Sequence, residues 1–448
     1  LLIILDTVRG FNLSAYGYER ETTPNIARLA KRGVRFEHAY STAPWTLPSH
    51  ASLFTGRPPN ELSADMLSPL DDTWPTLAEA MSARGYATAG FVANLGYCTA
   101  ESGLARGFSH YEDVTTSWLL VLHRSSVMRV VAVNTLVKLL GGAEGVRIAK
   151  TSTPIARLYR KDADQVNEDF LRWIPSSKGR PFFAFLNYFD AHRPYLPPSP
   201  YDTKYSPNIR DRYRVVKNGS KSKLPPEAAE VLTDAYDGTL VYLDDRIGKL
   251  TAELDRRGIL QNTLVIITAD HGEQFGEHGL FFHANSLYTQ LLRVPLIILG
   301  TNRVPAGVTV QTPVSLLDVA ATVLAATDSA GSESFPGQTL ARYYAGDSTK
   351  QATALPLFAS LGAKAQLIEA FAPKTGFRSV MMDGMHYIRS GKNQKGEVRE
   401  ELFDLARDPR ELNDLMTSDT GRAVLPRLRA ALAAGVPTEA PKVRTASR

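Results

Sequence analysis

Carboxylates and a histidine follow two apolar runs of the chain, and these residue types suit a divalent cation. Asp6 comes directly after the run 1–5, and Asp270 and His271 come just after the run 263–268. In an open α/β sheet, sites form beyond the carboxyl ends of the strands, so residues that follow two strands can meet at one edge. Two carboxylates and an imidazole offer oxygen and nitrogen ligands. The pattern predicts a metal site, although an aspartate after a strand is also typical of a plain turn.

A hydroxyl lies at the predicted start of a helix in the stretch 43–57. Thr46 can serve as the N-cap, Pro48 is tolerated in the first turn, and residues 51–54 continue as an apolar helical face. The N–H groups at a helix start favour an anion, so Thr46 would lie beside an anionic group bound there. Many helices open with such residues and do nothing else. The stretch gains a functional interpretation only together with the metal candidates.

Histidines are concentrated in the same segments. His278 and His283 follow Asp270 in a loop that also contains glycine, phenylalanine and glutamate, and His192 follows a phenylalanine-rich apolar run. Histidines beside a metal candidate suit general acids or contacts to an anion. The alternative for His192 is a loop histidine that packs on Tyr195 and the neighbouring prolines.

A sheet is needed to bring these residues together, and the order of apolar and amphipathic segments predicts one. We expect strands at 1–5, 34–40, 86–92, 180–188, 263–268 and 294–299, and helices at 22–31, 76–84, 228–257 and 315–326. The helix that opens at Thr76 has the spacing of a capping box. Alternating strands and helices predict an α/β fold with a mostly parallel central sheet sandwiched by helices.

The character of the sequence changes near residue 355. Shorter strands at 378–382 and 386–390 and a final helix predict a smaller C-terminal α+β subdomain over 355–437, after a catalytic domain over 1–345 and before a tail at 438–448. The segment 117–150 is apolar but interrupted by charged residues. It is interpreted as a helical cap over the site, or as a membrane-surface segment through 117–140, which Trp118 and the basic residues would suit.

Composition narrows the class of protein. The 448 residues carry a formal net charge of +5, with basic and acidic residues interleaved, so nucleic-acid binding is not indicated. Cys98 is the only cysteine, which excludes a disulfide within the chain. The chain begins inside a buried strand without an initiator methionine, so we expect a cut upstream, where a signal peptide or anchor would lie. A periplasmic or membrane-associated location is favoured over the cytoplasm, and no oligomeric state is predicted.

A series of motifs resembles the sulfatase family of the alkaline phosphatase superfamily over nearly the whole chain. In family order they are Asp6-Thr7-Val8-Arg9, Tyr16-Gly17-Tyr18, Thr23-Pro24-Asn25, Thr46-x-Pro48-Ser49-His50, Thr55-Gly56, Asp190-x-His192-x-Pro194-Tyr195, Asp270-His271-Gly272-Glu273, Arg293-Val294-Pro295 and Leu402-Phe403-Asp404-Leu405. The resemblance implies an alkaline-phosphatase-like fold. It also implies one divalent metal ion, which would be calcium, magnesium, manganese or zinc, on Asp6, Asp270 and His271.

The resemblance also implies roles for the other site residues. Thr46 occupies the nucleophile position and would be a further metal ligand. His192 and His283 match positions that contact the anion or the leaving group, and the latter position is often lysine in relatives. His50 stands where sulfatases commonly have arginine, so it is expected to be catalytic. We also expect Arg9 and His278 to bind the substrate.

This chain differs from sulfatases at the nucleophile. Sulfatases carry cysteine or serine there and convert it to formylglycine, whereas oxidation of Thr46 would give a ketone, and Cys98 is in no such motif. Thr7 and Phe11 stand where many relatives have aspartate. Relatives with threonine include phosphodiesterases and phosphoethanolamine or phosphoglycerol transferases.

The predicted function is hydrolysis, or transfer, of a phosphodiester or phosphonoester through a covalent Thr46 intermediate. The substrate would be a small molecule or a lipid or glycan ester. A sulfuric ester hydrolase is the alternative of the same class. A catalytically inactive binding protein on the same scaffold is the alternative of another class, and the presence of Asp6, Asp270, His271 and the histidine loop argues against it.

Overall fold

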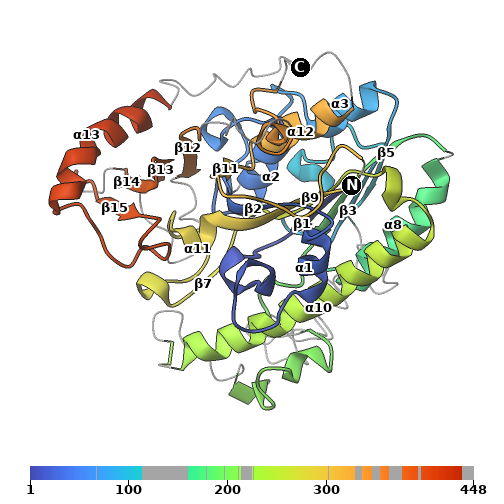
Figure 1. Ribbon diagram of the computed structural model, residues 1–448, viewed down its shortest axis with the longest axis horizontal. Coiled ribbons are helices and arrows are strands. Elements are labelled where there is room, and N and C mark those ends of the chain that lie inside the picture. The colour runs from blue at the N-terminus through green and yellow to red at the C-terminus, as the bar shows by residue number, and fades with distance from the viewer. Residues whose placement is uncertain are drawn as a thin grey trace, which may run out of the picture.

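The computed structural model describes residues 1–66, 68–113, 160–177, 179–195, 197–209, 211–212, 224–225, 227–300, 302–327, 335–345, 354–362, 376–391 and 395–435. Figure 1 shows a central twisted sheet with helices on both faces and a smaller unit at one side. The predicted insert at 117–150 and the predicted tail at 438–448 lie outside the described residues.

The central sheet has nine strands in the described part of the chain, in the order β10-β2-β9-β6-β1-β5-β3-β4, with β11 also on β2. The strands are β1 (Leu2–Leu5), β2 (Gly33–Tyr40), β3 (Ala87–Val92), β4 (His110–Glu112), β5 (Phe182–Tyr188), β6 (Val265–Ala269), β9 (Arg293–Leu299), β10 (Val308–Val310) and β11 (Val314–Ser315). Only β9 runs antiparallel to its neighbours, β2 and β6. The predicted mostly parallel sheet is therefore confirmed.

The middle strands are apolar on both faces because helices cover both faces. Every residue of β1 is at most 1% exposed, and β6 is buried throughout. This explains why these strands read as continuous apolar runs and not as alternating ones.

Helices form one layer on each face of the sheet (Figure 1). The longest is α10 (Ala228–Arg256), which contacts α1 (Pro24–Ala30) and α8 (Ala163–Trp173). On the other face, α2 (Thr46–Thr55), α3 (Leu77–Ala83) and α12 (Asp318–Ala326) contact one another. The capping box predicted at Thr76 is present, because its hydroxyl accepts from the Glu79 N–H at 3.2 Å and the Glu79 carboxylate accepts from the Thr76 N–H at 2.8 Å. The helix predicted over 315–326 starts later, since residues 314–315 form β11.

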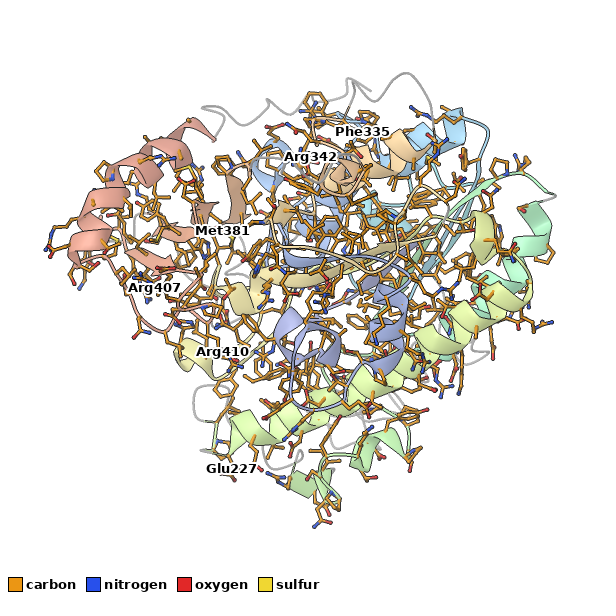
Figure 2. All side chains as sticks on the ribbon, viewed as in Figure 1. Glu227, Phe335, Arg342, Met381, Arg407 and Arg410 are labelled. Atoms are coloured by element: carbon orange, nitrogen blue, oxygen red, sulfur yellow. The ribbon has the colours of Figure 1, made fainter. Side chains whose placement is uncertain are left out.

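The C-terminal unit is a smaller α+β subdomain, as predicted. Its antiparallel sheet consists of β12 (Leu357–Leu361), β13 (Phe377–Met382), β14 (Met385–Ser390) and β15 (Glu400–Asp404), and α13 (Asp419–Ala434) packs on it. An apolar cluster joins the unit to the main body. Met381, labelled in Figure 2 between the two parts, is in this cluster with Trp45 and Leu287. The boundaries at 345 and 355 stay a prediction.

No helix in the described part of the chain is long and apolar enough to cross a membrane.

Candidate active site

Strand register places two aspartates side by side. Strands β1 and β6 are parallel neighbours in which Leu5 pairs with Ala269, so the residues that follow, Asp6 and Asp270, leave the sheet together. Asp6, Asp270 and His271 form a cluster in which one ligand atom from each residue lies within 4.8 Å of the others. All three side chains are fully buried. The structure thus brings the three predicted metal ligands together at the carboxyl edge of the sheet.

Each carboxylate uses one oxygen within the protein and leaves the other oxygen available. Asp6 Oδ2 accepts from Asn94 Nδ2 at 2.8 Å, and Asp270 Oδ1 accepts from the N–H groups of Thr7 at 3.1 Å and His271 at 2.8 Å. Asp6 Oδ1 and Asp270 Oδ2 are buried without a hydrogen-bond partner in the described part of the chain. Buried polar atoms without a partner are costly, and a cation would satisfy both oxygens.

His271 is oriented as a ligand. Its Nδ1 donates to Gly272 O at 2.9 Å, which leaves the Nε2 lone pair for a cation. Nε2 lies 3.5 Å from Asp270 Oδ2. Two orphaned carboxylate oxygens and an imidazole nitrogen fit a divalent cation.

The backbone at this edge is strained. Thr7 has φ 60, in the left-handed region that β-branched residues rarely adopt. This turn aims the Thr7 N–H at Asp270, so the strain helps to hold the two carboxylates in place.

Thr46 lies beside the metal candidates, with its hydroxyl oxygen 3.5 Å from His271 Nε2. The prediction that Thr46 is the N-cap of its helix is wrong. Trp45 occupies that position, and Thr46 is the first helical residue of α2. Trp45 has no side-chain oxygen to cap the helix, so the Thr46 hydroxyl is not used for capping. The helix is anchored further along, where Ser49 Oγ donates to Asp270 O at 2.6 Å.

His50 lies one turn after Thr46 and is fully buried. Its Nδ1 donates to Thr46 O at 2.8 Å and lies 3.6 Å from Asp270 Oδ2. Its Nε2 lies 3.9 Å from the sulfur of Cys98. His50 thus links the backbone of Thr46 to the metal cluster.

His283 and His192 also lie at this edge of the sheet. The ring centroid of His283 is 4.7 Å from that of His271 and 5.2 Å from those of His192 and Trp45. His283 Nδ1 is 2.7 Å from Glu273 Oε1, and the ring of His192 stacks on Phe189 at 4.2 Å.

The two predicted substrate-binding residues have protein partners. The Arg9 guanidinium is 2.7 Å from Glu277 Oε1, donates to Asn12 Oδ1 and Glu273 O, and lies over the Phe275 ring. His278 stacks on Tyr288 with ring centroids 3.6 Å apart. Their role in substrate binding stays a prediction.

Burial dominates the electrostatics of the site. It raises the pKa of Asp6, with a further contribution from the negative charge of Asp270, and it raises the pKa of Asp270 to about 7. Burial lowers the pKa of His271 and lowers that of His50 to about 4. The acids thus resist ionisation and the histidines resist protonation. A bound cation would reverse the balance for the acids, because it stabilises their ionised form.

Sequence reasoning did not single out two residues that position the site. Asn94 holds Asp6 from beyond β3, and Asn187, the penultimate residue of β5, accepts from the Asn94 N–H at 2.9 Å. Their positions at the ends of predicted strands could have indicated that they lie at the site. Glu273 stood in the motif with Asp270, but no role was assigned to it.

A separate broad cavity borders the opposite edge of the sheet. It is lined by residues at the amino ends of the strands, among them Leu2, Phe182 and Leu264. The described lining residues include no aspartate, glutamate, histidine or cysteine. It therefore lies apart from the candidate chemistry.

The family model that matches the chain is that of the sulfatases, over residues 1–329. Among curated relatives, the chain is 25% identical over 372 residues to the uncharacterized sulfatase YidJ of Escherichia coli K12, covering 76% of this chain and 70% of that protein. It is 26% identical over 331 residues to the multifunctional alkaline phosphatase superfamily protein PehA of Trinickia caryophylli, covering 63% of each. The aligned stretch is thus under two thirds of the length of PehA.

The fold is similar to that of solved structures. The phosphonate monoester hydrolase of Silicibacter pomeroyi superimposes with a TM-score of 0.72 at 20% identity, covering 97% of this chain and 94% of that one. This likeness supports the alkaline-phosphatase-like architecture of the whole described chain.

Proposed function

The chain belongs to the sulfatase family, and from that premise we propose that it is a metal-dependent ester hydrolase that uses Thr46 as its nucleophile. The observation that carries the proposal is the position of the Thr46 hydroxyl, 3.5 Å from His271 Nε2 and at the edge of the Asp6–Asp270–His271 cluster. A hydroxyl at a helix start beside a cation site is where a tetrahedral anion would bind.

Asp6, Asp270 and His271 would hold one divalent cation, with Thr46 as a further ligand. When bound, such a cation would favour the Thr46 alkoxide and offset negative charge on the transferred group. The donor set leaves calcium, magnesium, manganese and zinc as candidates.

The chain's own residues then carry the covalent step. The Thr46 hydroxyl loses its proton to solvent as its oxygen attacks phosphorus, the bond to the leaving oxygen breaks and that oxygen takes up a proton, which gives a phosphothreonine ester and an alcohol. His192 and His283 lie where they can contact the anion or give the departing oxygen a proton. Water, or an acceptor alcohol in a transferase, then attacks the ester and gives up a proton, and the departing Thr46 oxygen takes up a proton, which restores the hydroxyl.

The nucleophile favours phosphorus over sulfur. A phosphothreonine can be attacked in line by water. A sulfothreonine lacks the formylglycine route, in which a second hydroxyl on the same carbon expels sulfate. The substrate class proposed is therefore a phosphodiester or phosphonoester of a small molecule, lipid or glycan.

A sulfuric ester hydrolase is the second candidate. The family match and the resemblance to a protein named as a sulfatase favour it. In that case attack of Thr46 on sulfur would give a sulfothreonine ester. A periplasmic or membrane-associated location and membrane contact through 117–140 stay predictions.

Two measurements test the proposal. First, wild type and Thr46→Ala are compared on an aryl phosphodiester and on the matching aryl sulfate, with Thr55→Ala as the control. Thr55 is an equally buried threonine of α2, and its hydroxyl bonds to Ala51 O at the far end of the helix. Second, the mass of the Thr46 peptide is measured after acid quenching.

We expect Thr46-dependent turnover of the phosphodiester and a phosphoryl adduct on the Thr46 peptide. Turnover of the sulfate alone, with a sulfuryl adduct, would leave the second candidate. Equal activity of wild type and Thr46→Ala on both substrates would contradict both.

A further inference from the structure

We propose that Glu273 is a positioning residue that holds His283 so that Nε2 of the ring serves the leaving-group oxygen. This inference rests on the proposed ester hydrolysis and adds a residue and a proton path to it. Its basis is a short hairpin that no part of the metal site requires.

The hairpin sets Glu273 and His283 opposite each other. Strands β7 (Gln274–Phe275) and β8 (Phe281–Phe282) are antiparallel, and Gln274 pairs with Phe282. The residues just outside that pair are Glu273 and His283, at the open end of the hairpin. Paired positions bring side chains to about 5 Å of one another, which a carboxylate–imidazole hydrogen bond can span.

The hairpin holds His283 in a strained stretch. Phe282 has φ 68 and Ala284 has φ 63, and both lie in the left-handed region that residues with a Cβ rarely adopt. Each such residue costs about 1 kcal/mol or more, so contacts must hold the stretch in place. The Ala284 N–H donates to Pro44 O at 3.2 Å, which joins the hairpin to the segment before Thr46.

Both oxygens of Glu273 are engaged. Oε1 is 2.7 Å from His283 Nδ1, and Oε2 accepts from the Tyr195 hydroxyl at 2.7 Å. Glu273 and Tyr195 are fully buried, and Tyr195 packs against Tyr236 and Phe275. A carboxylate fixed from two sides cannot follow the imidazole if the ring turns, so it sets the orientation of the ring.

The carboxylate also sets which nitrogen reacts. Because Nδ1 donates to Glu273, the proton exchange with solvent or substrate falls to Nε2. The short hydrogen bond to this buried carboxylate also fixes the plane of the ring, so that Nε2 keeps one direction. The centroid of the His283 ring lies 5.2 Å from that of Trp45, the residue before Thr46, and 4.7 Å from that of His271, whose Nε2 is 3.5 Å from the Thr46 hydroxyl oxygen.

His283 gives up a proton in the first step of the reaction and regains one in the second. As the bond between phosphorus and the leaving oxygen breaks, the Nε2 proton moves to that oxygen and an alcohol departs. The neutral ring next takes a proton from the attacking water, and the departing Thr46 oxygen regains from solvent the proton that it lost on attack, which restores the starting state. Glu273 keeps its hydrogen bond to Nδ1 in both steps and does not touch the substrate.

The test uses Glu273→Gln, His283→Ala and the double variant on aryl methyl phosphodiesters whose phenol leaving groups range from acidic to weakly acidic. Glutamine keeps an acceptor for Nδ1 and a partner for Tyr195 while it removes the charge. Glu411→Gln is the matched control, since Glu411 forms the other buried glutamate–histidine pair, at 2.5 Å from His386. Tyr195→Phe removes the hydrogen bond to Glu273 Oε2 and leaves the contact between Glu273 and His283 in place. The melting temperature of each variant verifies that it is folded.

We expect Glu273→Gln to lower kcat about tenfold to a hundredfold with the weakly acidic phenols and only a few-fold with nitrophenol, which departs without a proton. His283→Ala should show the same trend, and the double variant should be no slower than His283→Ala. Tyr195→Phe should show a weaker form of the trend.

A loss that is uniform along the series, or effects of Glu273→Gln and His283→Ala that add in the double variant, would overturn this inference alone. The same series of aryl sulfates, run in parallel, separates it from the proposed function. Absence of Thr46-dependent turnover in both series would overturn the proposed function and the inference with it.

Discussion

Within the described residues, two buried histidine–glutamate pairs occur in different regions of the molecule. His283 and Glu273 form one at the carboxyl edge of the central sheet, with Nδ1 and Oε1 2.7 Å apart. His386 and Glu411 form the other where the C-terminal subdomain meets the main body, with the same two atoms 2.5 Å apart. In both pairs the glutamate is fully buried.

The surroundings of the two pairs differ. Glu411 also accepts from the Thr289 N–H at 2.7 Å, and the residue before it, Arg410, accepts from Gln290 through its carbonyl. Both contacts reach α11 (Thr289–Leu292) of the main body. His386 Nε2 is buried without a hydrogen-bond partner in the described part of the chain. This pair therefore fastens two parts of the fold together.

The site pair differs in what its ring faces. The ring of His283 lies against His271, His192 and Trp45, beside the metal candidates and Thr46, the proposed nucleophile. The same two side chains thus occur in two settings, one at the junction of two parts of the fold and one at the candidate active site.

Among substitutions in the two regions, Asp270→Asn at the candidate active site should cause the largest loss of activity. Loss of this ligand should deplete bound metal and lower kcat/KM about a thousandfold, because a catalytic cation contributes several kcal/mol and about 1.4 kcal/mol is tenfold. Inductively coupled plasma mass spectrometry would measure the bound metal, and phosphodiester turnover would measure kcat/KM.

Asp190→Asn is the control for Asp270→Asn. Asp190 is also a buried carboxylate with an orphaned oxygen, but it is outside the Asp6–Asp270–His271 cluster. It should keep one ion per chain. Full metal and full activity in Asp270→Asn would contradict the assignment of the site.

The two histidines should separate activity from stability. His283→Ala should lower kcat about a hundredfold, in the range of lost general acid catalysis. His386→Ala should leave activity per folded molecule within about threefold but lower the melting temperature, because breaking a buried pair costs about 3–5 kcal/mol. A hundredfold loss of kcat in a folded His386→Ala protein would break the comparison.

The buried carboxylate of Asp190, whose Oδ1 accepts from the Ala163 N–H at 3.4 Å, should respond to pH. Burial raises the pKa of Asp190 from 3.8 to about 7, and its Oδ2 has no hydrogen-bond partner in the described part of the chain. The folded state therefore holds this proton more tightly than the unfolded state. The stability that Asp190 contributes is complete below pH 3.8 and is lost as pH rises to about 7.

Asp190→Asn removes that dependence. Between about pH 5 and about pH 8, wild type should lose about 2–3 kcal/mol relative to the variant, at about 1.4 kcal/mol for each pKa unit. Urea unfolding of both proteins at the two pH values measures the difference. An unchanged difference would show that Asp190 ionises without cost.

The smallest effect is expected from His278→Phe. The substitution keeps an aromatic ring to stack on Tyr288, so the fold should be unchanged. If His278 binds the substrate as predicted, KM should rise about threefold to tenfold, the value of one lost hydrogen bond. An unchanged KM would contradict a role of His278 in substrate binding. Its stacking on Tyr288 would then be a structural contact at the interface with the C-terminal subdomain.

Much of this site follows from local sequence. Apolar runs specify the strands, because a strand covered by helices on both faces must be apolar throughout. Asp6 and Asp270 could be placed at strand ends for that reason. The Thr76 capping box also needs only residues three apart, and it formed as predicted.

Other features depend on packing between distant segments. The N-cap of α2 is Trp45 and not Thr46, since the backbone of Trp45 is still extended, and its side chain belongs to the apolar cluster that joins the C-terminal sheet to the main body. The antiparallel direction of β9 likewise comes from its partners β2 and β6, which lie more than 250 and about 30 residues away.

The sequence by itself determined which residue types could do chemistry here: two carboxylates, a cluster of histidines and a threonine where formylglycine cannot form. Only the tertiary structure decided their contacts. It turned one oxygen of each aspartate toward the protein and left the other buried without a hydrogen-bond partner in the described part of the chain. It also placed Glu273 within hydrogen-bond distance of His283, and Glu411 within hydrogen-bond distance of His386. Hydrogen-bond partners are set by strand register and hairpin geometry, which bring together residues that no sequence spacing connects.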